Sequence, residues 1–531
     1  MSDSFRQRGQ VLVIFTGTLF VLLLIAALVF DLGMSWMLRR QEQNAIDPGA
    51  IAAAKYVQAD FQYGATPQMI EAACHYARAS GFFPSASTDD GCVQANDPES
   101  AQLTVNYPPV GTSAGRFEGY FGYVQVSITR QHPNFFWQIF GNPTSSVTAS
   151  AVAANTSGDS NSYSLIALDP NSDSASGKIG GNGGTAKVSI VPATDPATGQ
   201  PYQGGYVQVN STFGGVVSPP TLASCALAGS SGTGALQVTG GSGITAPAIF
   251  VTGTCAENNN ATITTSAPGN GVTQGALQVG DPLADLQPPD PSAYPAGQCG
   301  AGGPTTGPTG NASKGCGVGS MAWSADATCS VTGSTCVTLN PGTYYGGWNI
   351  SNNVTLQLTP GIYIMAGGGI KLNSGGSLTS VMGGSGSPAP VLIFSTDNPA
   401  SHSQCINGTA SSTATQCQGP IDLEAQATLD LAPMDSGPYK GMLLWQDGNA
   451  SGSLLSPNSS GVTIGGQVNM NIAGTIYAPK VQVTLVGGGS VGGTASIQII
   501  SWQWMIGGGS NLTMPYDPNQ LYHLEQRGLV H

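Results

Sequence analysis

Residues 339–344 read Leu-Asn-Pro-Gly-Thr-Tyr, and residues 358–363 read Leu-Thr-Pro-Gly-Ile-Tyr, 19 positions later. Short β-prone runs of similar kind follow, separated by glycine, serine and asparagine, as far as NLTMPYD at 511–517. A period near 20 residues with glycine at the corners is typical of a β-solenoid, in which stacking of the coils buries the apolar face that a single coil would leave exposed. The repeat therefore predicts a right-handed β-solenoid-like region over residues 298–518, with a β-sandwich as the alternative.

The composition of the 531 residues agrees with many short strands. Only 8% of the residues are charged, against about 25% in ordinary globular proteins, and glycine occurs 75 times. Inward positions of such strands are apolar, and outward ones are serine, threonine, asparagine or glutamine. The net charge of −13 would repel a phosphate backbone, so the chain is not expected to bind nucleic acid.

A first β-rich segment is expected over residues 161–280, where runs such as AKVSIVPA at 186–193 alternate with turn residues. Residues 281–297 form a proline-rich connector to the solenoid-like segment, and residues 519–531 form a C-terminal tail. The chain therefore is predicted to be mainly β after its N-terminal region.

The N-terminal region contains an apolar stretch, Val11–Phe30, without a charged side chain. Its 20 residues would form a helix of about 30 Å, which matches the hydrocarbon core of a bilayer. The stretch is longer than the apolar part of a signal peptide and has no A-x-A-like cleavage site after it. We therefore expect residues 1–10 to be a cytoplasmic leader, and residues 11–30, with Val11, Phe20 and Phe30, to be a retained transmembrane anchor in the lipid bilayer.

The cysteines indicate which side of the membrane holds the rest of the chain, because arginines flank the span on both sides and do not orient it. All ten cysteines follow the span and none forms a CxxC motif, which favours disulfides in an oxidising compartment over zinc sites. We expect a single-pass membrane protein with its bulk outside the cytoplasm. Short-loop disulfides are predicted for Cys74–Cys92, Cys225–Cys255, Cys329–Cys336 and Cys405–Cys417, and Cys299 and Cys316 complete the candidates.

Residues 31–160 are expected to form a small α+β domain next to the membrane. The periodicity of apolar residues predicts the following elements: a helix at 66–79, strands at 120–129 and 146–155, and a short aromatic helix or turn at 134–140.

The first 60 residues resemble a known family. The leader ends Arg8-Gly9-Gln10, and the span is followed by Asp31-Leu32-Gly33, Arg39-Arg40-Gln41 and Gln43-Asn44-Ala45. This order resembles the TadE/TadG-like N-terminal domain of Flp (tight-adherence) pilus-assembly proteins. The resemblance implies an exported part of a type IV-related pilus or secretion machine, anchored in a bacterial cell membrane. Its partners would be other pilus-assembly proteins or minor pilins.

The chain departs from relatives of that family at three points. Asp47-Pro48-Gly49 interrupts the usual alanine-rich helix and predicts a kink or restart there. Ile14 stands where pseudopilin-like relatives carry a glutamate, so prepilin-peptidase processing is not expected. The Asp-x-Ser-x-Ser motif of a von Willebrand A-type domain is absent from the sequence.

No catalytic, cofactor or metal site is expected, because the matching motifs lack their structural context. Gly488–Gly492 fits G-x-S-x-G but is not followed by a helix. Asp169–Asp173 is similar to the start of an EF-hand loop, but Ser174 stands where that loop requires glycine, so an Asx turn is predicted. The five histidines are scattered, at His75, His132, His402, His523 and His531.

The sequence favours a non-enzymatic structural protein and identifies no small-molecule ligand. Trp502, Trp504 and Tyr516 are expected to pack the last coil rather than to bind a sugar. The alternatives are a pilus-independent adhesin and a β-helix enzyme acting on cell-surface polysaccharide, which would need paired carboxylates. The acids available for such a pair are Asp422, Glu424, Asp430 and Asp435.

Overall fold

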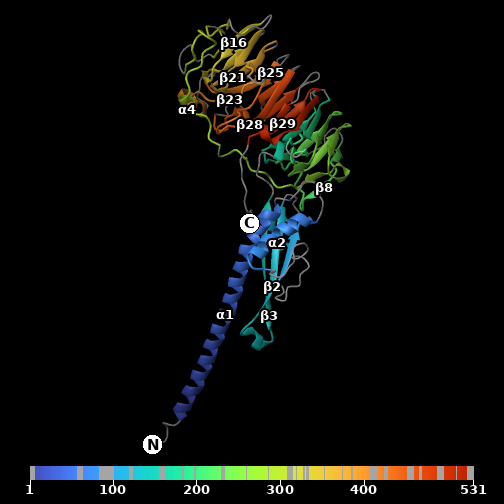
Figure 1. Cartoon of the computed structure of the whole chain (residues 1–531), viewed down its shortest axis with the longest axis vertical. Helices are drawn as coiled ribbons and strands as arrows, with labels where there is room; N and C mark the ends of the chain where they lie inside the picture. Colours follow the sequence, from blue (N-terminus) through green and yellow to red (C-terminus); the bar gives the residue numbers. More distant parts are fainter. Residues whose placement is uncertain are drawn as a thin grey trace. The chain divides into compact units, whose positions relative to one another are not determined.

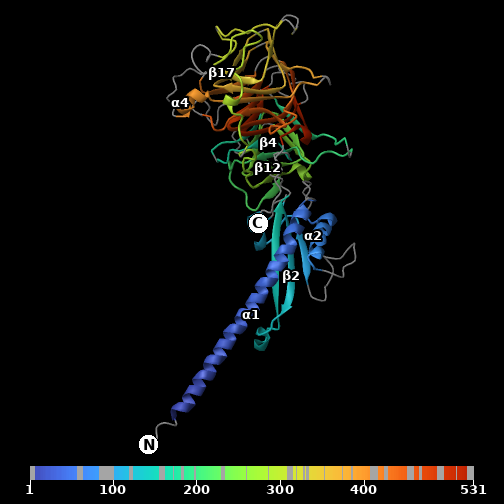
Figure 2. The same ribbon diagram turned by 60° about the vertical axis from the view of Figure 1, so that its left-hand side comes forward.

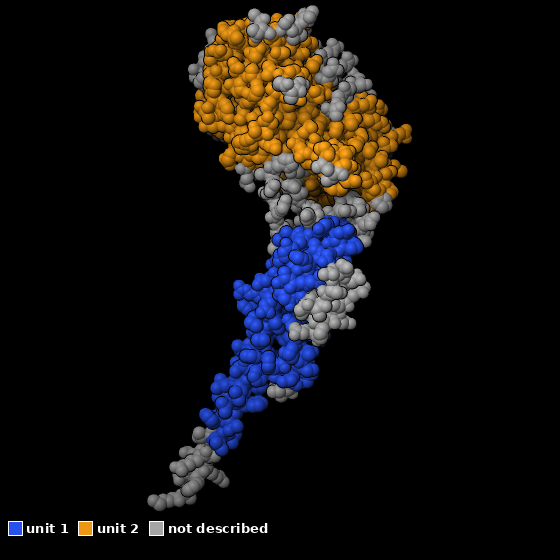
Figure 3. Space-filling model, viewed as in Figure 1, with its two compact units in different colours: residues 1–156, 527–531 blue, residues 157–526 orange. Residues whose placement is uncertain are grey.

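The computed structural model divides into two compact units (Figure 3). Unit 1 comprises residues 1–156 and 527–531, and unit 2 comprises residues 157–526. The residues that the structure describes are 6–54, 56, 64–82, 101–118, 123–154, 162–171, 173–180, 185–196, 199–228, 234–258, 260–284, 286–307, 315–318, 320–326, 329, 334–351, 353–373, 375–383, 387–406, 416–423, 428–450, 460–465, 469–486, 495–509 and 511–522.

Unit 1 is a long helix packed against a three-stranded antiparallel sheet of order β1-β2-β3 (Figures 1 and 2). The elements are α1 (Arg6–Ala54), α2 (Pro67–Ala79), β1 (Gln102–Asn106), η1 (Thr112–Phe117), β2 (Tyr123–Pro133), η2 (Trp137–Phe140) and β3 (Thr144–Ala154). The helices and strands expected in this region are therefore present, and β2 and β3 form a hairpin whose turn includes η2.

Small side chains allow the C-terminal half of α1 to approach its neighbours closely. Ala45, Ala50 and Ala53 are fully buried there against α2 and the sheet. A Cβ atom added at Gly49 would lie 3.2 Å from the carbonyl oxygen of Ala73 on α2, so glycine suits this helix crossing. The alanine-rich sequence thus forms a packed helix interface rather than an exposed linker.

Of the two outcomes predicted at Asp47-Pro48-Gly49, a kink or a restart, the restart is wrong, because the helix α1 is continuous through Pro48. Proline removes one backbone hydrogen bond from a helix, and the neighbouring contacts hold the segment in place. The Nε2 atom of Gln43 donates to the Asp47 carboxylate at 2.6 Å and lies 3.3 Å from the carbonyl oxygen of Ser150 on β3. Tertiary packing therefore overrides the local preference for a break.

Unit 2 consists mainly of strands that pair in parallel with a strand one coil further along the chain. The first stack of such strands contains, in order of pairing, β17 (Gly342–Tyr345), β20 (Gly361–Ala366), β23 (Val391–Thr396), β26 (Met442–Gln446), β28 (Asn469–Val486), β29 (Ala495–Gly507), β4 (Tyr163–Ala167), β7 (Tyr206–Val209), β12 (Ile249–Val251) and β15 (Val272–Gln274). The strand β8 (Thr221–Ala223) pairs with β15 in the antiparallel sense.

The second stack uses other parts of the long strands β28 and β29. Its members, in order of pairing, are β18 (Trp348–Ile350), β21 (Gly368–Leu372), β24 (Gln418–Leu423), β27 (Ser460–Gly465), β28, β29, β5 (Gly177–Ile179), β10 (Leu236–Val238), β13 (Cys255–Asn258) and β9 (Ala226–Ala228).

A third side is formed by two shorter series of parallel strands. The first series contains β16 (Thr335–Leu339), β19 (Val354–Leu358), β22 (Ser377–Ser380), β25 (Thr428–Leu431) and the start of β28. The second contains β30 (Asn511–Tyr516), β6 (Lys187–Pro192), β11 (Gly243–Ala246) and β14 (Thr262–Thr265). Four short helices lie between described strands: η4 (Pro268–Asn270), η5 (Pro291–Ala293), η7 (Pro399–Ser401) and α4 (His402–Ile406). A fifth, η8 (Pro518–Gln520), follows β30.

The two β-rich segments on either side of the proline-rich connector are joined by strand pairing. Ile499 of β29 pairs with Leu165 of β4, and β30 pairs with β6 along its whole length. The last strands of the chain therefore lie directly against the first strands of unit 2, so the two segments share one hydrophobic core.

The proline-rich connector (residues 281–297) and the five residues before it form a strap, defined here as residues 276–284 and 286–297, across the outer face of the first stack. Nε2 of Gln208 donates to the carbonyl oxygen of Leu277 at 3.1 Å, and the Tyr477 hydroxyl donates to Asp281 at 2.7 Å. Further along, the Thr343 hydroxyl donates to the carbonyl oxygen of Pro291 at 2.7 Å. The strap thus contacts β7, β28 and β17 in turn and covers a second apolar cluster that includes Phe394 and Trp445.

Disulfides tie loops of unit 2 to its strands. The bonded pairs are Cys225–Cys255, Cys299–Cys316, Cys329–Cys336 and Cys405–Cys417. Three of these are pairs that the sequence predicted, and Cys299–Cys316 joins the two candidates left over. Cys74 is also disulfide-bonded, whereas Cys92 lies outside the described residues.

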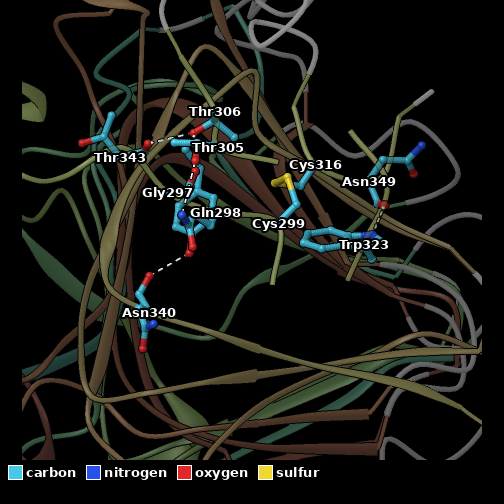
Figure 4. Close-up of a disulfide and its surroundings, with 11 residues drawn as sticks. Gly297, Gln298, Cys299, Thr305, Thr306, Cys316, Trp323, Asn340, Thr343 and Asn349 are labelled. Atoms are coloured by element: carbon cyan, nitrogen blue, oxygen red, sulfur yellow. Dashed lines mark hydrogen bonds between the residues drawn. A yellow bond between two sulfur atoms is a disulfide. The ribbon is translucent and has the colours of Figure 1, made fainter. Parts of the chain in front are cut away.

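The Cys299–Cys316 bond covers the β16–β18 end of the stacks, where it stands beside hydrogen-bonded turns (Figure 4). The Thr306 hydroxyl donates to the carbonyl oxygen of Gly297 at 2.9 Å, and Nε1 of Trp323 donates to that of Asn349 at 3.0 Å. The bond from Trp323 satisfies a backbone carbonyl group of β18 at the end of its stack.

The predicted class, mainly β with one long apolar N-terminal helix, is confirmed. The right-handed β-solenoid stays an interpretation. The parallel pairing within the two stacks and the two shorter series supports it, because β-sandwiches are built from antiparallel sheets.

Candidate functional site: the anchor helix and the hairpin docked on it

The N-terminal part of α1 presents apolar side chains outward on all sides. Phe20 is 62% exposed and Phe30 is 48% exposed, and the leucines and valines between them are similar. Val11 belongs to the same helix, but its side chain lies outside the described residues. The helix is long and apolar enough to cross a membrane. Exposed apolar surface on this scale is stable only in contact with lipid or another apolar partner.

Asp31 follows the apolar stretch and binds the turn of the β2–β3 hairpin. The backbone N–H groups of three successive residues donate to its carboxylate: Phe135 at 3.1 Å, Phe136 at 3.0 Å and Trp137 at 2.9 Å. Successive N–H groups that converge in this way form an anion-binding nest, and hydrogen bonds to a charged acceptor are stronger than neutral ones. The Asp31 carboxylate therefore attaches the hairpin turn, 104 to 106 positions away in sequence, to α1.

Two further contacts fix the hairpin against the helix, one at its turn and one at the end of β2. The ring of Phe30 packs edge-on against Phe135 and Phe136, with centroids 5.5 and 6.0 Å apart. One helical turn further along α1, the Ser35 hydroxyl lies 3.1 Å from Nε2 of His132, which is buried. The docking thus combines a charged hydrogen-bonded contact with aromatic packing.

Residues 9–58, which include nearly all of α1, match the family model Tad, described as putative Flp pilus-assembly TadE/G-like. The chain carries an N-terminal Tad domain. No curated protein and no solved structure matches the chain.

Within the Tad domain, Glu42 is buried against the sheet. It is 1% exposed, and neither of its carboxylate oxygens has a hydrogen-bond partner among the described residues. Burial raises the pKa of Glu42 to about 7, although the positive charges of Arg130 and Arg39 act to lower it. This carboxyl group therefore changes its charge near neutral pH.

Outside the Tad domain, the acids considered for catalysis do not converge among the described residues. Asp422 on β24 lies opposite Lys371 on β21. Asp430 accepts from Nδ2 of Asn471 at 2.8 Å, and Asp435 accepts from the Ser436 hydroxyl at 2.8 Å. Glu424 and Ser490 of the G-x-S-x-G match lie outside the described residues. The non-enzymatic reading stays a prediction.

The structure brings together a polar cluster that sequence reasoning missed. His402 Nδ1 lies 3.0 Å from Asp397, which is buried and also accepts from the backbone N–H of Gln418 at 2.7 Å. Asp447, one coil further, accepts from the Thr396 hydroxyl at 2.8 Å, and burial raises its pKa. Asp397 and Asp447 each directly follow a strand, and an alignment of β23 with β26 would have predicted their proximity.

The cluster does not form a metal site with the nearby sulfur atoms. Asp397, Cys405 and Cys417 have ligand atoms within 4.8 Å of one another, but the two cysteines are joined as a disulfide. Metal ions bind the thiolate form of cysteine, which a disulfide does not provide.

The remaining residues singled out from the sequence have structural contacts. Oδ1 of Asp169 accepts from the backbone N–H of Asn171 at 3.0 Å, which is the predicted Asx turn. Trp504 and Tyr516 are buried in the coil formed by β29 and β30, and Lys480 lies over the ring of Trp502. His75 packs edge-on against Tyr76. His523 and His531 lie outside the described residues.

Proposed function

We propose that this protein is a membrane-anchored, exported structural component of a Tad/Flp pilus assembly or secretion system, and that it is not an enzyme. The observation that carries the proposal is the coincidence of the Tad match with α1, whose first half is exposed and apolar. The second half of the same helix is the core of unit 1. One helix would thus link the bilayer directly to a folded domain.

The disulfides support an orientation with the N-terminus in the cytoplasm. Four disulfides occur among the described residues of unit 2, and disulfides persist in oxidising compartments. Unit 2 would accordingly lie outside the cytoplasm. Its stacked strands would serve as a rigid spacer or contact surface toward other pilus-assembly proteins or minor pilins.

Deletion of the gene, followed by electron microscopy of surface filaments, tests the proposal. Loss of filaments that the full chain restores is the expected result. Intact filaments with lost attachment would contradict the assembly role and favour a pilus-independent adhesin. Intact filaments with altered polysaccharide would favour a surface enzyme instead.

Complementation with two matched variants separates anchoring from other roles of α1. Leu22→Lys with Leu23→Lys places two charges in the apolar stretch and should abolish both membrane fractionation and filament rescue. Thr16→Leu with Thr18→Leu changes two residues of the same stretch and keeps it apolar. The two threonine hydroxyls donate to carbonyl oxygens of α1 itself, so their loss should not affect a contact with another element. This control should fractionate with the membrane and restore filaments.

A further inference from the structure

The turn of the β2–β3 hairpin exposes large aromatic side chains. Phe135, Phe136 and Trp137, here called the aromatic tip, are 54%, 41% and 41% exposed. Residues 133–146 contain no aspartate, glutamate, lysine or arginine. Soluble hairpins usually end in small polar turn residues, so an uncharged aromatic turn is unusual for a segment that faces water.

The contacts with α1 place the aromatic tip at the end of the apolar stretch. The three backbone N–H groups that bind the Asp31 carboxylate belong to this tip, and so do the two rings that pack against Phe30. With a rise of about 1.5 Å per residue, Asp31 lies within a few ångströms of the boundary of a hydrocarbon core that contains residues 11–30. The tip therefore lies at the depth of the polar headgroups.

The chemistry of the tip fits that depth. Tryptophan collects at membrane–water interfaces, where its apolar ring and its polar N–H group both find suitable surroundings. Phenylalanine and tryptophan also supply the apolar face of segments that lie in this layer. The exposed apolar surface of α1 also continues past the span at Leu32 and Trp36, which are 58% and 72% exposed. The aromatic tip is thus continuous with the apolar surface of the anchor.

The Asp31 nest explains how a carboxylate can be tolerated at this depth. A charged group near hydrocarbon is costly unless it is paired. Asp31 is 4% exposed, and three backbone donors satisfy its oxygens. The same contact satisfies the N–H groups of the turn, so neither partner enters the interface with an open hydrogen-bonding group.

We propose that the aromatic tip inserts into the headgroup layer of the lipid bilayer and forms a second membrane contact of unit 1 beside α1. This inference rests on the proposed anchoring of α1 in the membrane. Two contacts, one spanning and one interfacial, would fix the depth and rotation of the helix, which a single apolar span leaves free.

The test uses the full chain in phosphatidylcholine–phosphatidylglycerol vesicles. An environment-sensitive fluorescent amino acid is introduced at one position at a time, in place of Trp137, Phe20 or Val110. Val110 is the matched control, because it is 52% exposed but lies beyond Asn106, which pairs with Gln125 near the opposite end of β2. Quenching is measured with iodide in the water and with lipids that carry nitroxides at shallow or deep positions.

The inference predicts that shallow nitroxide lipids quench position 137 at least threefold more than position 110, and that iodide does the reverse. Position 20 should be quenched by deep nitroxides. Iodide quenching at 137 equal to that at 110, with position 20 still shielded, would overturn the interfacial tip and leave the anchor standing. Iodide access at position 20 would overturn the anchor itself.

A second measurement guards against a probe that disturbs the turn. Phe135→Ser with Phe136→Ser keeps the backbone N–H groups that bind Asp31 but removes the apolar rings. Hydrogen exchange at residues 135–137 should then rise several-fold in vesicles. In Val110→Ser, exchange at these residues should stay unchanged. Equal exchange in the two variants would overturn the proposal.

Discussion

Unit 1 and unit 2 are held together in different ways. In unit 1, single side chains have roles that no other described residue of the unit repeats. The Asp31 carboxylate binds three backbone N–H groups, and the Glu42 carboxylate is buried without a hydrogen-bond partner among the described residues. In unit 2 the same contact recurs from coil to coil. Tyr344 and Tyr363 each donate a hydrogen bond of 2.7 Å to the carbonyl oxygen four residues before. In unit 1, therefore, one substitution can remove the whole contact between the hairpin turn and α1. In unit 2, a substitution in one coil leaves the equivalent hydrogen bond of the neighbouring coil in place.

The largest effect is expected from Asp31→Ala. The change leaves three backbone donors of the hairpin turn without their acceptor, and we expect a loss of about 2–4 kcal/mol in the free energy of unfolding of unit 1. Chemical denaturation in detergent micelles, with hydrogen exchange at residues 135–137, would measure it. Asp47→Ala is the control, because the Asp47 carboxylate accepts a hydrogen bond from Gln43 on the same helix and holds no second element in place. Equal losses of stability in both variants would show that the Asp31 contact does not stabilise unit 1 more than the single bond of Asp47 does.

A substitution at a crowded position tests how far repetition protects unit 2. A Cβ atom at Gly177 would lie 2.7 Å from the ring of Trp504, which is buried in the neighbouring coil. We expect Gly177→Ala to destabilise unit 2 by about 1–3 kcal/mol through overpacking. Gly280→Ala has no atom within 4 Å of its added Cβ and should change the stability little. Thermal unfolding of the two variants measures this difference, and equal Tm values would contradict the prediction.

The pH dependence of unit 1 should depend on Glu42. Since its pKa in the folded protein is raised from 4.5 to about 7, folding favours the protonated form. The stabilisation is complete below pH 4.5 and is lost as the pH rises through 7. We expect the Tm of unit 1 to fall by roughly 4–8 °C from pH 5 to pH 8, and Glu42→Gln to remove most of this fall.

Glu71→Gln is the matched control for this titration, because Glu71 is exposed and lies 3.8 Å from Arg78. Its Tm should follow the pH in the same way as that of the unsubstituted chain. A Glu42→Gln variant that keeps the full pH dependence would contradict the assignment to Glu42.

The smallest effect is expected where one coil loses a contact that its neighbour keeps. Tyr363→Phe removes the hydroxyl, which lies 2.7 Å from the carbonyl oxygen of Thr359 and 2.8 Å from that of Leu339, but leaves the ring stacked on Tyr344, at 6.1 Å between centroids. We expect a cost of about 0.5–1.5 kcal/mol. A denaturation midpoint shifted as far as that of Asp31→Ala would break the comparison between the two units.

Features that depend on local pattern could be predicted from the sequence. The apolar stretch at residues 11–30 is uniform, and the repeat at Leu339 and Leu358 brings those two residues into register on adjacent strands. Hydrophobic periodicity alone therefore indicated the helix and the β-rich class.

Features that depend on long-range contacts could not be predicted. Nothing local marks Asp31 as the partner of Phe135, because the acceptor lies on a helix and the donors are backbone groups of any residue type. The preference of Asp-Pro-Gly for a helix break was overridden by packing against α2. The prolines of the strap are typical of linkers, so the sequence predicted a connector. Its packing could not be predicted, because the hydrogen bond from Tyr477 to Asp281 joins residues 196 positions apart.

The pairing of β29 with β4 has a consequence for the order of folding. Gln503 and Asp169, which are hydrogen-bonded across this junction, are 334 positions apart, so the contact has a very high contact order. Because synthesis proceeds from the N-terminus, the edge of β4, β5 and β6 has no partner until residues 495–516 have emerged. Nascent chains that stop short would retain an open strand edge, the kind of surface that invites aggregation. Closure of this junction therefore requires that synthesis has passed residue 516.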